Sequence, residues 1–289
     1  MPHPPIGIAG AGAVARVLGR LLVAHGEPVV ALAGRDRSRA VEAAATIGAG
    51  ISGVAYADLP RLASRILIAV SDEGVTPVAE ALVAGGMRSG IVLHTSGARG
   101  TSALTSLQAC GVSCGLLHPL QSITRDDEAS ILDGVTFAVV GDPEACAWAE
   151  AIVAMAGGRV VHPREDRLAA YHAGAVMASN AVAAVVDAAL LLMADAGIDP
   201  DEARQGIASL SRTALDNALT RGPLAAVTGP VMRGDAATVA AHLHALADVQ
   251  PTVRELYRAV SHHLLDLARR RGLDPMHIGA VDAVLQSEG

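Results

Sequence analysis

Short apolar runs alternate with helix-length, alanine-rich segments in the part of the chain up to residue 162, and this alternation constrains the fold most strongly. Between the early runs, segments 13–25 and 38–47 each have the length of one helix. This spacing is typical of strand–helix–strand units, and it predicts a mainly parallel, doubly wound α/β sheet. The expected strands are 5–9, 28–33, 53–56, 66–70, 90–94, 112–117, 136–140 and 159–162.

A glycine-rich turn follows the first of these strands and opens a helix. Gly10 permits the tight turn, Gly12 lets the backbone approach a pyrophosphate, and Ala15 allows close packing of helix on strand. The backbone N–H groups of Ala13 and Val14 lie at the positive end of the helix dipole and could donate to phosphates. In this context the pattern predicts a Rossmann dinucleotide-binding site.

The end of the second strand favours NADP(H) over NAD. NAD sites place Asp or Glu there to bind the ribose 2′-hydroxyl, whereas this chain has Gly34. Arg35 and Ser38 could hold a 2′-phosphate, although Asp36 lies between them and the arginines could simply belong to a solvated loop. Two residues at the carboxyl end of the fourth strand are expected beside the nicotinamide ribose, because ligands lie outside the carboxyl ends of such strands. They are Val70 and Ser71.

After His162-Pro163 the pattern predicts helices only. We expect one long helix over 164–196, a second that begins at Asp199-Pro200 and ends at Gly222, and further helices over 236–249 and 252–271. A short helix should follow Asp274-Pro275. The chain is therefore predicted to form two domains, a Rossmann NAD(P)-binding domain over 1–162 and an all-helical substrate and dimerisation domain over 163–289.

Composition excludes several kinds of function. All 22 basic residues are arginine, so lysine Schiff bases, P-loop lysines and lysine acids are excluded. A net charge of −7 and only 2% aromatic residues argue against nucleic-acid binding. Apolar residues make up 51% of the chain, an excess that should be buried in a core or a subunit interface, and a homodimer is expected. In such a dimer, the C-terminal loop of one chain could complete the site of its partner.

Membrane insertion and export are not expected. The most apolar stretch, 173–194, contains Asp187, which a lipid-spanning helix disfavours, so we predict a buried helix of a soluble protein. The N-terminus lacks the basic region of a signal peptide, and three cysteines without metal-ligand spacing fit a reducing cytoplasm. The eleven histidines lack the i, i+4 spacing of a metal site, so no metal is predicted.

Polar residues gather at four places in an otherwise apolar sequence, and these supply the candidate substrate site. Histidine titrates near neutrality and suits general-acid work, while an asparagine amide can polarise a carbonyl. His172, Val176 and Asn180 are spaced to share one helix face, but each polar group could equally be a satisfied core residue. The catalytic candidates are His172, Asn180, His118 and Ser96; the substrate-binding candidates are Thr95, Gln121, Ser122, Thr228 and Arg233.

These clusters resemble those of Rossmann-like proteins that carry a helical C-terminal domain of unknown function. The motifs that carry the resemblance are His94-Thr95-Ser96-Gly97, His118-Pro119-Leu120-Gln121-Ser122, Phe137-Ala138 with Gly141-Asp142, Tyr171-His172-Ala173-Gly174-Ala175-Val176 with Ser179-Asn180, Asp216-Asn217, and Thr228-Gly229-Pro230 with Arg233-Gly234-Asp235. Their architecture is similar to that of pyrroline-5-carboxylate reductase, prephenate dehydrogenase and the β-hydroxyacid dehydrogenases. The resemblance covers nearly the whole chain, and some members of the group are thought to reduce ketopantoate.

The chain also departs from these relatives. The β-hydroxyacid dehydrogenases place a catalytic lysine one turn before an asparagine that corresponds to Asn180, and that lysine position is Val176 here. His172, one turn earlier, is the expected replacement. Thr228-Gly229-Pro230 stands where pyrroline-5-carboxylate reductases carry a Ser-Pro-Gly-Gly-type loop, but it lacks the paired glycines. Prephenate dehydrogenases carry a His-Pro pair comparable to His118-Pro119.

The resemblance implies an NADPH-dependent reductase of a small 2-oxo acid, with ketopantoate as the leading substrate. In the expected mechanism, His172 or His118 protonates the carbonyl oxygen, Asn180 and Ser96 orient the substrate, and Arg233 and Thr228 hold its carboxylate. Activity should then fall as pH rises above roughly 7, through the histidine range. The alternatives are an imine reductase of the pyrroline-5-carboxylate type and a non-catalytic NADP(H)-binding regulatory protein.

Overall fold

The computed structural model describes residues 3–287 and has a Rossmann-type sheet followed by helices, as predicted. In the described residues, eight strands form one sheet in the order β3-β2-β1-β4-β5-β6-β7-β8. Neighbouring strands are parallel except β6 and β7, which pair in the antiparallel sense. The strands are β1 Ile6–Ala9, β2 Val29–Ala33, β3 Ser52–Val54, β4 Arg65–Ile68, β5 Ile91–His94, β6 Ser113–Pro119, β7 Thr136–Gly141 and β8 Arg159–Val161.

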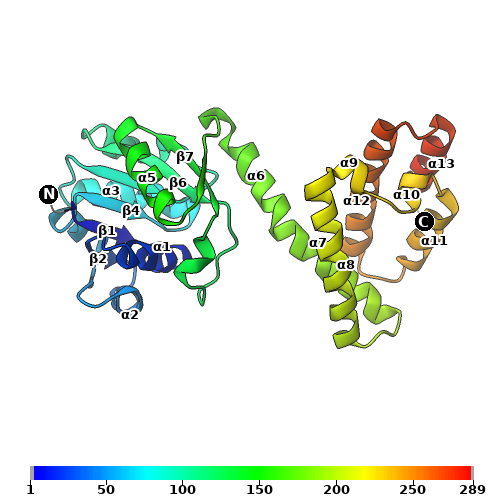
Figure 1. The fold of residues 1–289 in the computed structure, drawn as a ribbon, viewed down its shortest axis with the longest axis horizontal. Helices are drawn as coiled ribbons and strands as arrows, with labels where there is room; N and C mark the ends of the chain where they lie inside the picture. Colours follow the sequence, from blue (N-terminus) through cyan, green and yellow to red (C-terminus); the bar gives the residue numbers. More distant parts are fainter. Residues whose placement is uncertain (1–2, 288–289) are drawn as a thin grey trace. The chain divides into compact units, whose positions relative to one another are not determined.

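Apolar side chains on both faces of the sheet explain why its strands are near-continuous hydrophobic runs. In β4, Leu67 packs into one core, whereas Ile66 and Ile68 pack into the other, and all three are fully buried. Helices cover both faces (Figure 1). The helices of the N-terminal unit are α1 Ala13–Ala24, α2 Arg37–Ile47, α3 Val75–Ala84, α4 Thr105–Gln108, α5 Pro143–Met155 and α6 Leu168–Ala178, of which α6 leads away from the sheet. Short 3₁₀ turns are η1 Tyr56–Arg61, η2 Asp72–Gly74, η3 Thr101–Leu104, η4 Ala129–Leu132 and η5 Glu165–Arg167.

The chain divides into two compact units, 1–179 and 180–289. The sheet itself ends at Val161, next to the predicted domain boundary at residue 162, whereas α6 belongs to the first unit. The boundary at 162 therefore stays a prediction. Met1, Pro2, Glu288 and Gly289, which fall within the two predicted domains, lie outside the described residues.

The single long helix predicted over 164–196 is wrong in one respect, because it is interrupted at Ser179. The structure has α6 up to Ala178 and α7 over Asn180–Asp195. The Ser179 hydroxyl donates to the Ala175 carbonyl at 2.8 Å, an i to i−4 bond that competes with the helical ladder and often bends helices. Regular helical spacing therefore joins His172 to Val176 but does not continue to Asn180.

The apolar stretch Glu165–Asp195 is long and hydrophobic enough to cross a membrane by length and composition alone. We expected its central part to be buried in a soluble protein, and in the single chain it is not. Of the described residues in α7 none is buried, and in α6 only Leu168 is. A single chain therefore leaves most side chains of this apolar stretch at least partly exposed.

The C-terminal unit contains helices only in its described residues. Its helices are α7, α8 Pro200–Arg221, α9 Pro223–Ala226, α10 Pro230–Arg233, α11 Ala236–Ala245, α12 Pro251–Arg271 and α13 Pro275–Gln286. As predicted, Asp199 caps α8, accepting from the N–H of Asp201 at 2.9 Å. The helix expected after Asp274-Pro275 is α13, which has 12 residues and is shorter than α8 and α12, with 22 and 21. A small core within this unit includes Val239, Leu265 and Val281.

Candidate functional site

The glycine loop between β1 and α1 lies where the strand order reverses, between β1 and β4. Gly10 has φ +140°, and a Cβ on it would lie 2.0 Å from the Ala69 carbonyl oxygen, so only glycine fits this turn. Gly12 forms the N-cap of α1, and a Cβ on it would meet no described atom within 4 Å. No side chain among the described residues caps this end of α1, which begins with Ala13 and Val14. These features fit a pyrophosphate.

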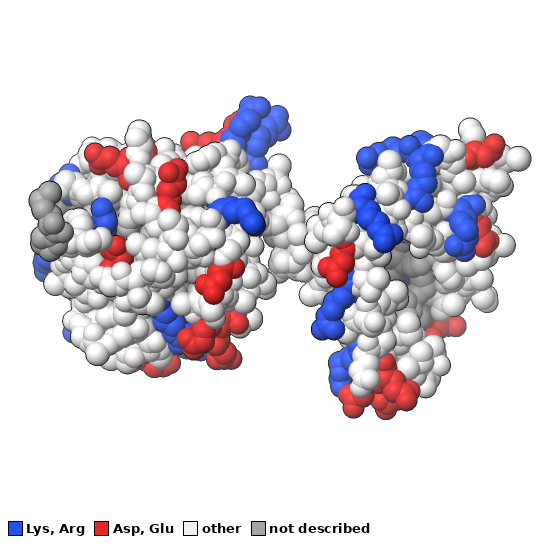
Figure 2. Space-filling model, viewed as in Figure 1, with Lys and Arg blue, Asp and Glu red and all other residues white. Residues whose placement is uncertain are grey.

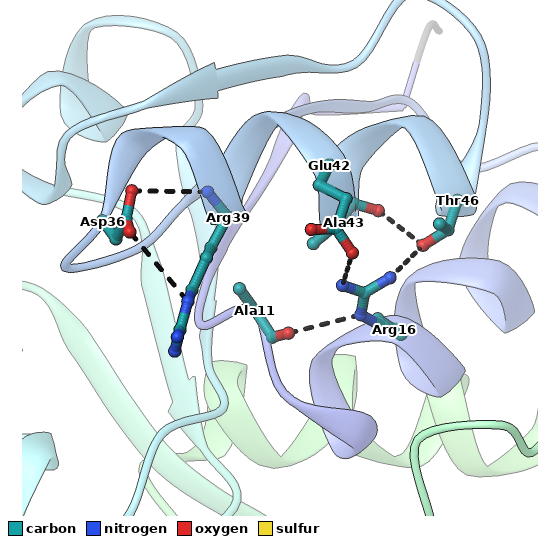
Figure 3. A network of polar contacts seen from close by, with 7 residues as sticks. All are labelled: Ala11, Arg16, Asp36, Arg39, Glu42, Ala43 and Thr46. Atoms are coloured by element: carbon teal, nitrogen blue, oxygen red, sulfur yellow. Dashed lines mark hydrogen bonds and ion pairs between the residues drawn. The ribbon is translucent and has the colours of Figure 1, made fainter.

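A buried arginine ties this loop to α2 (Figure 3). The Arg16 guanidinium donates to the Ala11 carbonyl at 3.3 Å, to the Thr46 hydroxyl at 2.8 Å and to the Glu42 carboxylate at 3.4 Å. Its side chain is only 8% exposed. Because Arg16 holds the Ala11 carbonyl, it orients the peptide between the two glycines. The sequence analysis missed this residue, which carries no motif of its own.

The predicted specificity loop, Gly34 to Ser38, joins β2 to α2. Asp36 caps α2 by accepting from the N–H of Ser38 at 2.8 Å, and it also accepts the Ser38 hydroxyl at 2.7 Å. These hydrogen bonds, the Ser38 hydroxyl first, lower the pKa of Asp36. Asp36 is thus occupied within the loop rather than at a ribose, and Arg35 is exposed. Val70 and Ser71 follow β4 at the same carboxyl edge of the sheet.

Strand β5 delivers a loop that is folded around a buried imidazole. His94 Nδ1 accepts from the N–H of Ser96 at 3.2 Å, so Nε2 carries the proton and bonds to the Gly100 carbonyl at 3.2 Å. Burial lowers the pKa of His94 to about 4, and His94 is therefore neutral at pH 7. Thr95 and Ser96 are also buried, and the Ser96 hydroxyl accepts from the N–H of Arg99 at 3.2 Å.

Three polar rings meet beside this loop. His118 was expected after the sixth strand, but it lies within β6, paired with Ala138, because the strand continues to Pro119. His118 Nδ1 and the Tyr171 hydroxyl lie 2.8 Å apart, and the His118 and His172 rings meet edge to face with centroids 5.8 Å apart. A Cβ on Gly97 would lie 2.7 Å from His118 Nε2 and 2.7 Å from His172 Nδ1. We call Gly97, His118, Tyr171 and His172 the imidazole cluster.

Burial sets the protonation of two members of the imidazole cluster. It lowers the pKa of His118 to about 4, helped by nearby His172 and opposed by Asp72, and it raises the pKa of Tyr171 to about 12. Both side chains are therefore uncharged at neutral pH and share one neutral hydrogen bond. Among the described residues, Nδ1 of His172 is buried without a hydrogen-bond partner. His118 is thus unsuited to the acid role near pH 7 that it shared with His172 in the sequence analysis.

Two further predicted residues of the N-terminal unit, Gln121 and Ser122, lie outside the imidazole cluster. Gln121 and Ser122 lie in an exposed loop after β6, where the Gln121 amide donates to the Ile131 carbonyl at 3.0 Å and accepts from the N–H of Ser122 at 3.1 Å. Asn180, Thr228 and Arg233 belong to the C-terminal unit. There Arg233 is exposed, and its charge helps to lower the pKa of Asp235, after the hydrogen bonds from Thr238.

Sequence reasoning missed the partners that organise the site. It singled out Tyr171 beside His172 but gave it no role, since neighbouring helix residues point about 100° apart and a contact with His118 cannot be foreseen. Glu165, before α6, accepts from the N–H of Thr101 at 2.7 Å and so holds the end of the loop after β5. Within residues 3–287 no three His, Cys, Asp or Glu side chains gather as a metal site requires.

Comparison with known families gives two partial matches. Residues 5–96 match the model of the coenzyme F420-dependent NADP oxidoreductases, and residues 135–264 match a domain of unknown function, DUF2520. No curated protein sequence matches the chain. These matches agree with the resemblance to Rossmann-type oxidoreductases with a helical C-terminal domain.

Solved structures share the fold along nearly the whole chain. A Bacteroides fragilis protein described as a candidate NADP oxidoreductase matches with a TM-score of 0.76 and 22% identity, over 91% of this chain and 98% of its own. An imine reductase from Pseudomonas sp. matches with a TM-score of 0.68 and 18% identity, over 98% of this chain and 100% of its own. A pyrroline-5-carboxylate reductase from Coxiella burnetii matches with a TM-score of 0.57 and 15% identity, over 98% of this chain and 99% of its own. At these identities the likeness establishes the fold.

Proposed function

We propose that this chain is an NADP(H)-dependent reductase that acts on a carbon–oxygen or carbon–nitrogen double bond in a small substrate. The proposal depends on two features that occur together at the carboxyl edge of the sheet. There, an open glycine loop that fits a pyrophosphate and the imidazole cluster lie on strands of one parallel series, β1, β4, β5 and β6. The match of residues 5–96 to NADP oxidoreductases and the shared fold of imine and pyrroline-5-carboxylate reductases support it.

The N-terminal unit would hold the cofactor through backbone groups and one arginine. Gly10 and Gly12 give the pyrophosphate room, and Ala13 and Val14 donate to it. Arg35 would bind the 2′-phosphate, and the Ser38 hydroxyl, once released from Asp36, would donate to it. Gly34 leaves space for that phosphate, and Val70 and Ser71 would border the ribose. When bound, the nicotinamide supplies the hydride.

The imidazole cluster would supply the proton that the reduced substrate takes up. In this proposal His172 donates a proton to the substrate, because its Nδ1 is buried without a partner among the described residues. His118 and Tyr171 position the His172 ring through contacts made in their neutral forms. Ser96, Thr95, Gln121 and Ser122 remain proposed substrate contacts, as do Asn180, Thr228 and Arg233 from the C-terminal unit.

Two substrate classes are proposed. Ketopantoate is the leading carbonyl substrate, on the resemblance of the sequence motifs to a group with ketopantoate-reducing members. A cyclic imine of the pyrroline-5-carboxylate type is favoured equally by the folds of the solved imine and pyrroline-5-carboxylate reductases. An imine can arrive already protonated, so a protein acid matters less for it than for a ketone.

NADPH consumption tests the function. Purified protein is assayed with ketopantoate, with pyrroline-5-carboxylate and with a panel of 2-oxo acids, while NADPH binding is followed separately by fluorescence. Turnover of one class assigns the substrate type. Tight NADPH binding without turnover of any compound would replace this proposal by the non-catalytic regulatory protein, and absence of NADPH binding would refute both.

The acid role of His172 has its own test. His172→Ala should lower kcat for a ketone about 100-fold, the contribution typical of a positioned general acid, and leave NADPH affinity unchanged. Loss on a protonated imine should be smaller, because no proton transfer to it is needed. Full activity of His172→Ala on a ketone would exclude the assignment.

We further propose a cytoplasmic homodimer. The exposed apolar side chains of α7 and α8 support a subunit interface, and Val185, Leu210 and Leu219 are 45%, 64% and 76% exposed in the single chain. Such an interface would account for the apolar excess of the composition.

A further inference from the structure

The surface of the helical C-terminal unit has an open hollow of about 650 Å³, which we call the cavity, between the end of α8 and the last turns of α12. Its volume is that of a site for a small organic molecule. Four lining residues from α12, at positions 263, 267, 270 and 271, follow the spacing of one helix face. The wall from the other side is the turn Arg221 to Ala225, where Gly222 has φ +82° and ends α8.

The chemistry of the cavity wall is uneven. Leu267 is buried and forms an apolar floor together with Leu224 and Pro223. The cavity is also lined by four exposed basic residues, Arg221, His263, Arg270 and Arg271, and no Asp or Glu is among the described residues that line it. This is notable in a chain with a net charge of −7. Figure 2 shows basic side chains gathered over this end of the unit, near α9 and α12.

The helix dipole explains only part of this arrangement. Arginine in the last turn of a helix is favourable, and it accounts for Arg221 in α8 and for Arg270 and Arg271 in α12 one helix at a time. It does not account for two helix ends that place their guanidinium groups around one cavity. The neighbouring Arg269, which does not line the cavity, has an acidic partner, Asp266, at 2.5 Å. Within residues 3–287, Arg221 and Arg270 show no ion pair.

Arg271 connects the two walls of the cavity. Its guanidinium donates to the Leu224 carbonyl and so ties the end of α12 to the turn after α8. That bond to a neutral acceptor leaves the positive charge of Arg271 uncompensated. Guanidinium groups bind phosphate and carboxylate oxygens through paired N–H donors. These charge-assisted hydrogen bonds are stronger than hydrogen bonds between neutral groups.

We propose that this cavity is a binding site for a small organic anion that carries two negative charges on an apolar body, such as a phosphate monoester. Arg221 and Arg270 bind the charged group, and Leu224 and Leu267 contact the apolar body. The site lies within the C-terminal unit and is independent of the proposed reductase activity.

Binding of phenyl phosphate to the full chain tests this, measured by calorimetry in the presence of NADP⁺, which occupies the other expected phosphate site. Phenyl phosphate should bind once per chain, more tightly than inorganic phosphate, which lacks the apolar body, and more tightly than benzoate, which has a single charge. The double variant Arg221→Gln/Arg270→Gln should lose affinity at least about tenfold, as expected for two charge-assisted contacts.

The matched control is Arg212→Gln/Arg269→Gln. It removes the same charge from exposed positions of the same two helices, outside the cavity, and it should keep the affinity of the unaltered protein. Equal loss in both double variants would reduce the effect to general electrostatics and overturn the proposal. No saturable binding at millimolar phenyl phosphate, or a change of oligomeric state in the first variant without any binding, would also overturn it. If that variant does not fold, Arg270→Gln alone is compared with Arg269→Gln.

Discussion

At the residue scale, the candidate site depends on a glycine that no catalytic motif requires. Gly97 lets His118 Nε2 and His172 Nδ1 approach its Cα from β6 and α6. A methyl group there would lie 2.7 Å from both nitrogens, too close for any real contact, and the rings would have to separate.

We therefore expect Gly97→Ala to lower kcat/KM about 100-fold, the effect of a displacement near 1 Å, while NADPH affinity is kept. Gly174→Ala, in α6, is the control, since a Cβ there meets nothing within 4 Å and alanine favours the helix. Steady-state kinetics and cofactor titration measure both variants. Wild-type kinetics in Gly97→Ala would remove the imidazole cluster from the mechanism.

His94 predicts a dependence of stability on pH. Its folded-state pKa of about 4 lies below the ordinary value of 6.5, so between these values the unfolded chain binds the proton more readily. The contribution of neutral His94 is complete above pH 6.5 and decreases as pH falls towards 4, by about 3 kcal/mol. Urea unfolding at a series of pH values should give a shallower dependence for His94→Gln than for wild type. The exposed His244→Gln should keep the wild-type dependence, and parallel curves for all three would contradict the prediction.

At the element scale, α1 and α2 are joined by a charged side chain as well as by apolar packing. The Arg16 guanidinium donates hydrogen bonds to three protein oxygens, from Ala11, Thr46 and Glu42 (Figure 3). Because one acceptor is the carbonyl of the glycine loop itself, the arginine connects the orientation of that loop to the position of α2. The specificity loop enters α2 at its other end.

Arg16→Met keeps most of the side-chain volume and removes these bonds. We expect the free energy of unfolding to fall by about 1–3 kcal/mol, because the charge-assisted hydrogen bonds of the buried guanidinium are lost, and NADPH to bind more weakly. Arg39→Met, which removes an exposed arginine from the same pair of helices, should change neither quantity. Denaturant unfolding and cofactor fluorescence give the two readouts. Unchanged NADPH affinity in a destabilised Arg16→Met would show that Arg16 serves stability alone.

At the scale of the whole molecule, the exposed apolar side chains of α7 and α8 support the proposed homodimer. Light scattering at micromolar concentration should give twice the mass of the chain. Leu210→Glu/Leu219→Glu should give monomers, because burying two carboxylates without partners costs more than an interface of this kind gains. Val41→Glu, an exposed apolar position in the N-terminal unit, is the control. A monomeric wild type, or a double variant that stays dimeric, would refute this interface.

Sequence periodicity determined the sheet, the glycine loop and most helix starts. These features depend on local rules: apolar runs of strand length, Gly10 at a turn only glycine can make, and Asp199 as a cap two residues before the donor it satisfies. Local rules also located His118, Tyr171 and His172 as polar residues in an apolar chain. They could not show which of these side chains meet.

Only the tertiary structure decided the rest, since it depends on distances between residues far apart in the chain. It brought His118 and Tyr171 within 2.8 Å of one another, buried His118 so that it stays neutral, and enclosed His94 in its own loop. It also left α7 exposed and interrupted the long helix at Ser179, because a serine hydroxyl can bond the preceding turn in a way that hydrophobic periodicity does not report. The sequence alone determined which groups are present and on which elements, and the packing of those elements decided which of them act together.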